Sequence, residues 1–417
     1  MKNCLIFITA GFPYGSTEPF IESELPSCAD FFDKIIFFSL DAVGTSVRQL
    51  PQNAESFSVS PKNKRLSRLC DVLQAAFRAP RISDEFPKDK KSAALSIKRR
   101  LFLKYFETRS ERHFREIVKV MENMDFSGYD NIVIYSYWFF VTAMTGILLK
   151  EHLGKSYDSV RLVSRGHRYD IYSFANSLDY LPGRNRLFSG IDMLYVCSEH
   201  GKNYLSANYP RWSHKIRRSY LGTLDHGPGA VADDGIFRIV SCSRVVPVKR
   251  LDRIAESLAL LKDSGVRLSW THIGTGPDLR TLKRKTDKLL RFMEVNFIGA
   301  LSNKSVLELY SHRPFDVFIN VSGNEGLPVS IMEAASFGIP SIATDVCGTG
   351  EIVLNGKTGV LIPADFQNNL LAAAIKDFAL ISRGEYIALR HNARKNWEEN
   401  FRAKDNYSQF AQEISGG

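Results

Sequence analysis

The hydrophobic pattern of this chain repeats a short apolar run, a loop containing Gly, Pro or Ser, and an amphipathic stretch. This rhythm is typical of strands that alternate with helices. The apolar runs are continuous and lack the polar alternation of a strand with one wet face, so they predict parallel strands buried on both faces. The expected strands cover residues 4–9, 34–39, 131–135, 161–163 and 193–197 in the first half, and 237–242, 267–273, 294–298, 317–321 and 341–344 in the second.

A stretch rich in glycine divides the two halves. Residues 220–229 contain three glycines and Pro228, a composition that favours a linker. We therefore expect a Rossmann-like domain over 1–219, a second one over 220–395, and a terminal helix over 396–417 that crosses back to the first domain. Two such α/β domains would face each other across a cleft, and ligands of open α/β sheets bind beyond the carboxyl ends of the strands.

The charge balance indicates a negatively charged partner. The chain has 417 residues and a formal net charge of +10, which suits nucleic acid, an anionic membrane surface or phosphorylated small molecules. Residues 61–119 are rich in Lys and Arg, and 97–106 place large apolar residues between them. This segment predicts a basic amphipathic helix that lies on an anionic bilayer; the alternative is an ordinary surface helix with a solvated charged face.

The cysteines and the N-terminal run indicate the compartment. The six cysteines contain no CxxC pair, which argues against a zinc site or a disulfide framework and for a reducing environment. The first apolar run is too short for a signal peptide, and no run approaches the ~20 apolar residues of a membrane span. We expect a cytoplasmic protein, soluble or peripheral on the inner face of the membrane.

The segment 321–340 carries the clearest candidate chemistry. A strand ends near Val321, a glycine-bearing loop follows, and Pro328 is placed to begin a helix that ends at Gly338. The amides of Gly326 and Leu327 would then lie at a helix N-terminus, which favours anions. Glu333 sits in an apolar part of this helix, where a carboxylate needs hydrogen-bond donors such as ribose hydroxyls. The alternative for Glu333 is a structural contact within the fold.

Two cations and a glycine follow other strand ends. Arg244 and Lys249 come after the strand at 237–242, and Gly274 comes after the strand at 267–273. Arg and Lys at a strand end suit a diphosphate, although surface cations are more often only solvated. Gly274 and its neighbour Gly276 indicate a close approach of backbone to a ligand.

The ordered set of motifs resembles the retaining glycosyltransferase family 4, whose members have the GT-B fold of two Rossmann-like domains. The resemblance covers about 218–365 and rests on these positions: 243–244 with 249–250, 274–277, 297–299, Glu325 and Glu333 with seven residues between them, 338–340, Gly348, 351–353 and 356–359. One departure is Cys347, where the family commonly has a glycine.

The resemblance implies a role for each of these positions. Arg244 and Lys249 would hold the donor diphosphate, with the Gly274 loop beside it. Glu333 would bind the ribose, and Ile298 would lie along the base. Glu325 and the amides of Gly326 and Leu327 would bind the donor sugar.

The first half resembles the family more loosely. Residues 11–18, with Gly15, are similar to the family's first glycine-bearing loop, which approaches the donor phosphates and the acceptor. Residues 164–172 resemble a segment of bacterial exopolysaccharide, colanic-acid and O-antigen transferases, whose histidine reaches the transferred sugar; His167 holds that place. The alternative for His167 is a satisfied structural histidine.

The resemblance implies transfer of a sugar from a nucleoside-diphosphate sugar to a saccharide hydroxyl, with retention, in cell-surface polysaccharide synthesis. His167 and Glu325 are the catalytic candidates, the acceptor is expected to be lipid-linked, and UDP, GDP and ADP are equal candidates for the nucleotide. The chain has no Asp-x-Asp motif, so no metal or other cofactor is expected. The alternatives are another GT-B enzyme, such as an epimerase or a phosphorylase-like protein, and a basic nucleic-acid-binding protein. Acidic residues within the basic stretch argue against nucleic acid.

Overall fold

The computed structural model describes residues 1–15, 17–42, 48–59, 64–77 and 86–416. The chain forms two compact units. The first unit consists of Met1–Ser219 together with Tyr407–Gly417, and the second is Tyr220–Asn406. The chain therefore leaves the first unit after Ser219, builds the second, and contributes its last residues to the first again.

The first unit is built on a parallel sheet of seven strands in the order β3-β2-β1-β4-β5-β6-β7. The central strand β1 pairs with β2 and β4, so that Phe7 lies opposite Phe37 and Tyr135. The strands are β1 (Asn3–Thr9), β2 (Lys34–Ser39), β3 (Ala54–Ser58), β4 (Asn131–Ser136), β5 (Val160–Gly166), β6 (Met193–Val196) and β7 (Ile216–Arg218). The edge strands β3 and β7 were not expected from the sequence because neither contains a continuous apolar run.

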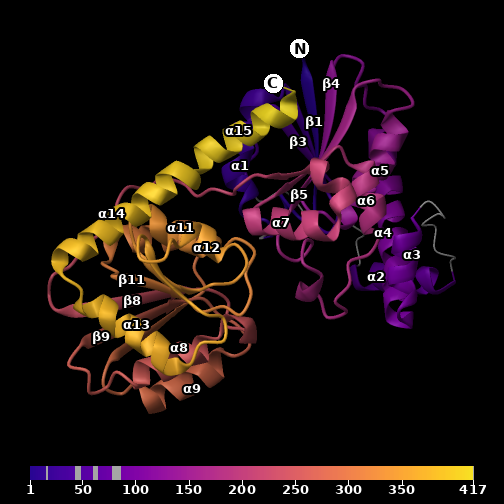
Figure 1. Ribbon diagram of the computed structural model, residues 1–417. Helices are drawn as coiled ribbons and strands as arrows, with labels where there is room; N and C mark the ends of the chain where they lie inside the picture. The colour runs from indigo at the N-terminus through magenta and orange to yellow at the C-terminus, as the bar shows by residue number, and fades with distance from the viewer. Residues whose placement is uncertain (16, 43–47, 60–63, 78–85, 417) are drawn as a thin grey trace. The chain divides into compact units, whose positions relative to one another are not determined.

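Helices cover both faces of this sheet (Figure 1). Helix α1 (Ile21–Phe31) and the end of α15 (Ala403–Ser415) pack against one face, where Leu25 and Phe410 join Phe7 and Tyr135 in one core. Helix α5 (Val141–Leu153) packs on the strands from the other side, with α4 (Ile97–Met121) and α2 (Lys64–Phe77) outside it. The remaining helices of the unit are α3 (Pro87–Ala94), η1 (Ser173–Ala175), α6 (Arg184–Gly190), α7 (Glu199–Asn208) and η2 (Pro210–Lys215).

The basic segment at 97–106 forms the helix expected of it, with its apolar residues divided between the interior and the surface. Leu103 and Phe106 are buried, because α4 packs against α5, while Ile97 is 70% exposed. The larger exposed apolar face belongs to α2, where Leu69, Leu73 and Phe77 are exposed. None of the helices in the described ranges is both long and apolar enough to span a bilayer.

The second unit is a parallel sheet of six strands in the order β10-β9-β8-β11-β12-β13. Its strands are β8 (Ile236–Cys242), β9 (Arg267–Ile273), β10 (Glu294–Gly299), β11 (Val317–Asn320), β12 (Ser341–Thr344) and β13 (Gly359–Ile362). A core around Trp270 and Ile319 joins the sheet to α8 (Leu251–Ala259), α9 (Leu279–Leu289) and α13 (Asn368–Leu380). The other helices are η3 (Pro247–Lys249), α10 (Asn303–His312), α11 (Val329–Ser336), α12 (Thr349–Ile352) and α14 (Arg383–Asn400), and α11 packs against α14.

The helix after β11 differs from its expected bounds by one residue. Pro328 is the N-cap of α11 and Val329 is its first residue, because Pro328 has an extended backbone. Gly338 follows the helix with φ of +70°, a left-handed conformation that ends a helix. Because β11 lies beside β8 in the sheet, the helix α11 that follows β11 begins beside the end of β8. The candidate site is found at this edge of the sheet.

Candidate functional site in the second unit

Four adjacent strands of the second unit end at a common edge of the sheet, and each carries an expected site residue there. Arg244 follows β8, Gly274 follows β9, Ile298 lies at the end of β10, and Glu325 lies in the loop after β11. These strands are neighbours in the order β10-β9-β8-β11 and run parallel. The sheet therefore gathers residues that are up to 81 positions apart along one edge.

Lys249 and Glu325 form an ion pair at this edge. The Lys249 ammonium lies 2.5 Å from Oε1 of Glu325, and both side chains are largely buried, with 22% and 11% exposed. The side-chain amide of Asn320 donates to the same oxygen at 3.2 Å. Arg244 is exposed and has no ion pair in the described part of the chain. The structure thus brings Lys249 and Glu325 together and leaves Arg244 outside this pair.

Glu333 is buried on α11, and its carboxylate accepts a hydrogen bond from the side-chain amide of Asn303 at 2.6 Å. Burial raises the pKa of Glu333 to about 7. Asn303 is the first residue of α10, which follows the end of β10, one of the strands that end at this edge. Glu333 therefore lies at the same edge as the Lys249–Glu325 pair.

Two loops at this edge have features of a ligand site. The loop after β9 requires a glycine, and the loop after β11 leads to a helix without a side-chain cap. Gly274 has φ of +141°, and a Cβ atom there would lie 1.9 Å from the carbonyl oxygen of Ser243. The loop after β9 is therefore held against the residue that precedes Arg244. Gly326 and Leu327 precede the N-cap of α11, and Pro328 provides no side-chain cap. The Ile331 amide donates to the carbonyl oxygen of Pro328, and the amides of Val329 and Ser330 remain for an anion by the usual chemistry of a helix start.

His167 lies in the first unit, directly after β5. Its ring packs on Tyr137 and Trp138, and its Nε2 lies 3.1 Å from the carbonyl oxygen of Tyr137. Because a carbonyl only accepts, this contact assigns the proton to Nε2 and leaves Nδ1 as the acceptor nitrogen. Burial and then the charge of Arg165 lower the pKa of His167 to about 3, so the ring is neutral at neutral pH.

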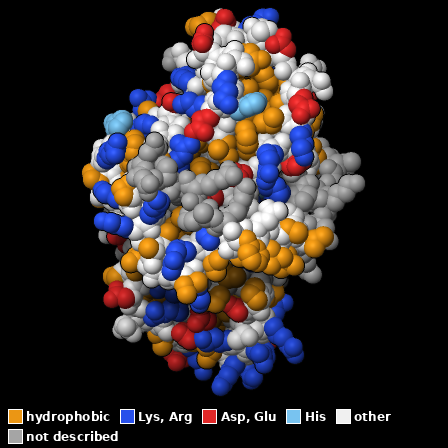
Figure 2. Space-filling view, turned by 90° about the vertical axis from the view of Figure 1, so that its right-hand side faces the viewer, with side chains coloured by type: hydrophobic (Ala, Val, Ile, Leu, Met, Phe, Trp, Pro, Cys, Tyr) orange, Lys and Arg blue, Asp and Glu red, His pale blue; other side chains and the backbone are white. Residues whose placement is uncertain are grey.

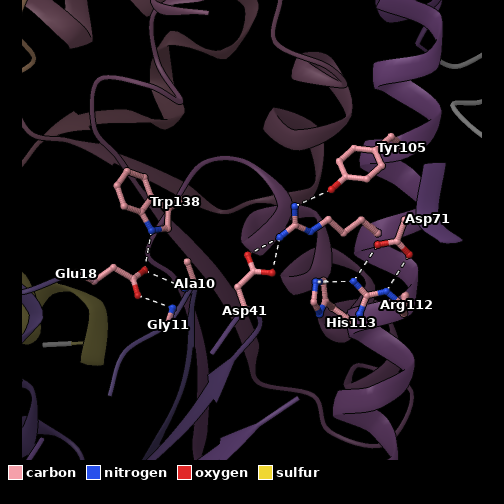
Figure 3. Close-up of polar contacts among 10 residues, drawn as sticks. Ala10, Gly11, Glu18, Asp41, Asp71, Tyr105, Arg112, His113 and Trp138 are labelled. Carbon is pink, nitrogen blue, oxygen red and sulfur yellow. Dashed lines mark hydrogen bonds and ion pairs between the residues drawn. The ribbon is translucent and has the colours of Figure 1, made fainter. Parts of the chain in front are cut away.

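The glycine-bearing loop of the first unit is organised by Glu18, as Figure 3 shows. Glu18 is buried, and its carboxylate accepts from the amides of Ala10, Gly11 and Phe12 at 2.7–2.8 Å. It also accepts from the indole N–H of Trp138 at 2.7 Å. Gly15, farther along the loop, is exposed with φ of +72°. The amides at the start of this loop are thus engaged by Glu18, and Gly15 lies beyond them.

Several residues of the site were not foreseen from the sequence. Asn303 follows Ser302, which caps α10. A Ser-Asn pair after a strand is a helix-start signal that could have drawn attention to it. Glu18 gave no signal, because its four contacts depend on a folded loop and on Trp138, 120 residues away. Within the described ranges no cluster of three or more His, Cys, Asp and Glu side chains could hold a metal ion.

Comparisons with known proteins find similar sequences for the part of the chain that carries this geometry. Residues 230–402 match the family model of glycosyl transferases group 1. A protein named colanic acid biosynthesis glycosyltransferase WcaL, from Escherichia coli, is 26% identical over 241 residues, 56% of this chain and 59% of that protein. A GDP-mannose-dependent phosphatidylinositol monomannoside mannosyltransferase from Mycolicibacterium smegmatis is 29% identical over 171 residues, 38% of this chain and 44% of that protein. The chain spans well under two thirds of the length of these curated relatives.

Solved structures share the fold over the whole chain. The Anabaena protein HepE in complex with UDP and glucose has a TM-score of 0.67 at 14% identity and covers 99% of both chains. Sucrose-phosphate synthase from Thermosynechococcus elongatus has a TM-score of 0.70 at 15% identity, covering 99% of this chain and 98% of that one. Residues 230–402, which hold the Lys249–Glu325 pair and Glu333, thus match the model of the glycosyl transferases group 1 family, within a chain that has the GT-B fold.

Proposed function

We propose that this protein is a glycosyltransferase that moves a sugar from a nucleoside-diphosphate sugar to a hydroxyl of a saccharide acceptor. The observation that carries the proposal is the edge of the second sheet, where Lys249, Glu325 and Glu333 lie inside the segment matched by the family model. An ammonium group, two carboxylates and uncapped helix amides in one place suit a ligand that combines a diphosphate with hydroxyl groups.

Each group has a distinct task in this proposal. Lys249 and Arg244 bind the diphosphate and stabilise the charge that builds on it as the sugar leaves. Glu333 accepts hydrogen bonds from the ribose, and Ile298, which is 36% exposed, lies along the base. Glu325 and the amides of Gly326 and Leu327 hold the sugar.

We further propose that the reaction retains anomeric configuration, as in family 4, and that it needs no metal. Front-face substitution suits this site, because the leaving diphosphate can accept the proton of the acceptor hydroxyl. Being neutral near pH 7, His167 would act as a hydrogen-bond partner of the transferred sugar. Full activity in EDTA is expected, and a loss restored by Mg²⁺ or Mn²⁺ would contradict this part.

The acceptor in this proposal is lipid-linked, and the protein works at the inner membrane face in cell-surface polysaccharide synthesis. The names of the relatives support this, since they include colanic acid and phosphatidylinositol mannoside synthesis. The exposed apolar residues of α2 also support it. Figure 2 shows hydrophobic side chains beside Lys and Arg on the face that carries α2 and α4.

The test is a panel of UDP-, GDP- and ADP-sugars screened by thermal shift. A ligand at 100 times its dissociation constant should stabilise the protein by about 2.7 kcal/mol. Glu333→Ala and Lys249→Ala should abolish this stabilisation, while Lys262→Ala, at an exposed cation in the turn after α8, should keep it. Unchanged donor affinity in both site variants would overturn the assignment of the donor site.

A second GT-B activity, such as an epimerase or a phosphorylase-like reaction, would bind its nucleotide at the same edge of the second sheet. The two are separated by product analysis. A transferase releases free nucleoside diphosphate in step with glycosylation of the added saccharide, whereas an epimerase converts the sugar nucleotide with no acceptor present.

A further inference from the structure

The first unit contains a cavity of about 500 Å³ that holds none of the expected site residues. Its walls come from α3, the loop that follows η1, α6 and η2. The volume falls within the range of ~300–1,000 Å³ that is usual for small-molecule sites. The cavity is therefore large enough for a ligand of a few rings.

Aromatic and cationic side chains line this cavity together. Tyr180, Tyr209 and Trp212 supply aromatic rings, and Arg99, Arg184 and Arg211 supply guanidinium groups. The guanidinium of Arg211 lies 4.8 Å from the centre of the Trp212 ring, and that of Arg99 lies 5.4 Å from the Tyr180 ring.

The three guanidinium groups have no carboxylate partner among the described residues. Arg99 donates to the carbonyl oxygens of Leu178 and Asp179. The buried carboxylate of Asp89, which also lines the cavity, is engaged by the backbone amides at the start of α6. Arg211, which is exposed and stacks on Trp212, can present its guanidinium to a ligand, and this pair suits a sugar ring with a negative charge, because the ring stacks on the indole and the anion binds Arg in a forked geometry.

Arg184 connects this cavity to His167. It is 2% exposed, donates to the carbonyl oxygens of Phe139 and Asp170 at 2.9 and 2.6 Å, and its Nε has no partner in the described part of the chain. The carboxylate of Asp170 in turn accepts from the amides of Phe139 and His167 at 2.6 and 2.7 Å. The backbone of His167 is therefore linked to the cavity wall through Asp170 and Arg184.

We propose that this cavity is an acceptor subsite for a negatively charged saccharide residue, next to the one that receives the new sugar. This inference rests on the proposed transferase function, because it takes the loop of His167 as the place where the acceptor is presented. The charge is a carboxylate, as in a uronic acid, or a phosphate, and both would engage Arg211 in the same way, while Arg184 holds the cavity wall.

The test is calorimetric titration of the full chain with three ligands: a tetragalacturonate, a phosphorylated oligomannoside and a neutral maltotetraose. The tetragalacturonate or the phosphorylated ligand should bind at least tenfold more tightly than the neutral one, and the tighter of the two identifies the charge. Arg211→Gln, at an exposed position, should remove about tenfold of that affinity, and Trp212→Leu should remove a similar amount. Lys155→Gln, an exposed cation of the same unit, should have no effect.

Equal binding of the neutral and charged ligands, or affinities within twofold of wild type in both cavity variants, would overturn the subsite. Titration of the wild type with the nucleotide sugars in parallel keeps the two proposals apart. If nucleotide sugars bind but the acidic saccharides do not, only the subsite falls. If no nucleotide sugar binds, the transferase proposal falls as well.

Discussion

At the scale of single residues, burial decides which groups of the candidate site carry charge near neutral pH. Burial raises the pKa of Glu333 to about 7, whereas His167, with a pKa lowered to about 3, stays neutral. A carboxylate accepts hydrogen bonds from hydroxyl groups only with its oxygens, and it does so more strongly when ionised. Glu333 is therefore poised to change its affinity for a ribose within the physiological pH range.

Donor binding should strengthen as the pH rises from 6 to 8. With a pKa of about 7, Glu333 passes from mostly protonated to mostly ionised over this interval, which corresponds to about a tenfold gain in affinity if only the ionised form binds. Calorimetric titration with the nucleotide sugar selected by the panel measures this gain, because its diphosphate does not titrate in the interval. Glu333→Gln should give a flat profile; the same slope in that variant would show that another group titrates.

The free energy of unfolding should change with pH in the opposite direction: it should fall as the pH rises. Because the pKa of Glu333 in the folded chain lies above its usual value of 4.5, its contribution is fully present below pH 4.5 and is lost as the pH rises through about 7. Wild type should lose ~2–4 kcal/mol of unfolding free energy relative to Glu333→Gln between pH 4.5 and 8. Urea unfolding of both proteins at the two pH values measures the difference.

Glu18 should matter more to stability than its place in a loop suggests. Removing its side chain in Glu18→Ala would leave the three loop amides and the Trp138 N–H without their acceptor, which should cost ~2–5 kcal/mol. Glu22→Ala is the matched control, because Glu22 is half exposed and forms a surface ion pair with Arg48, and it should cost under ~1 kcal/mol. Equal losses in the two variants, measured by urea unfolding, would show that Glu18 does not organise the loop.

At the scale of elements, the sequence predicts those strands and helices whose position depends on the local pattern of apolar residues. The long apolar strands β1, β2, β8 and β9 were predicted within a residue or so, because each is a continuous buried run. Strand β13 was not, because its four residues follow a turn and do not stand out as a run. The strand ends were enough to predict the contact between Lys249 and Glu325, whereas Arg244 has no ion pair in the part of the chain that the structure describes and Glu333 bonds Asn303 instead.

The partners of those residues could not be predicted in the same way. Asn303 donates a hydrogen bond to Glu333, which is 30 residues away in the sequence. The sequence pattern alone does not indicate which strand end lies next to the start of α10. The cavity of the first unit depends on five separate segments, at 86–92, 99, 173, 179–185 and 208–212, so no single motif marks it. Contacts of this kind arise only when the sheet order is known.

Substitution of Gly274 tests how closely the loop after β9 approaches the end of β8. Gly274→Ala would drive a Cβ atom into the carbonyl oxygen of Ser243, whereas a Cβ atom at Gly299, with φ of +88°, would meet nothing within 4 Å. Gly299→Ala should cost only the ~1–2 kcal/mol of left-handed backbone, and Gly274→Ala should cost more and weaken donor binding. Urea unfolding and donor titration compare them; equal effects would contradict the close approach.

At the scale of the whole molecule, the last helix ties the end of the chain to its beginning. Phe410 and Ile414 belong to the core of the first unit. Phe410 lies over the guanidinium of Arg165 at 4.2 Å, and Arg165 forms a fully buried ion pair with Glu24 at 3.2 Å. The attraction within a buried ion pair is strong only while the surrounding side chains, here Phe410, exclude water. The first unit therefore depends on residues that follow the second unit in the sequence, although its sheet is complete by Arg218.

Phe410→Ala should accordingly weaken the first unit and spare the second. Truncating a buried Phe costs ~3–5 kcal/mol, and here it also admits water to the pair of Arg165 and Glu24. Hydrogen exchange resolved by peptide should show lost protection in β1 and β4, with β8 and β9 unchanged. Phe378→Ala, which removes an equally buried Phe from the core of the second unit, should give the reverse pattern. If Phe410→Ala loosened both sheets equally, the two units would have to unfold as one, and the tail would not belong to the first unit alone.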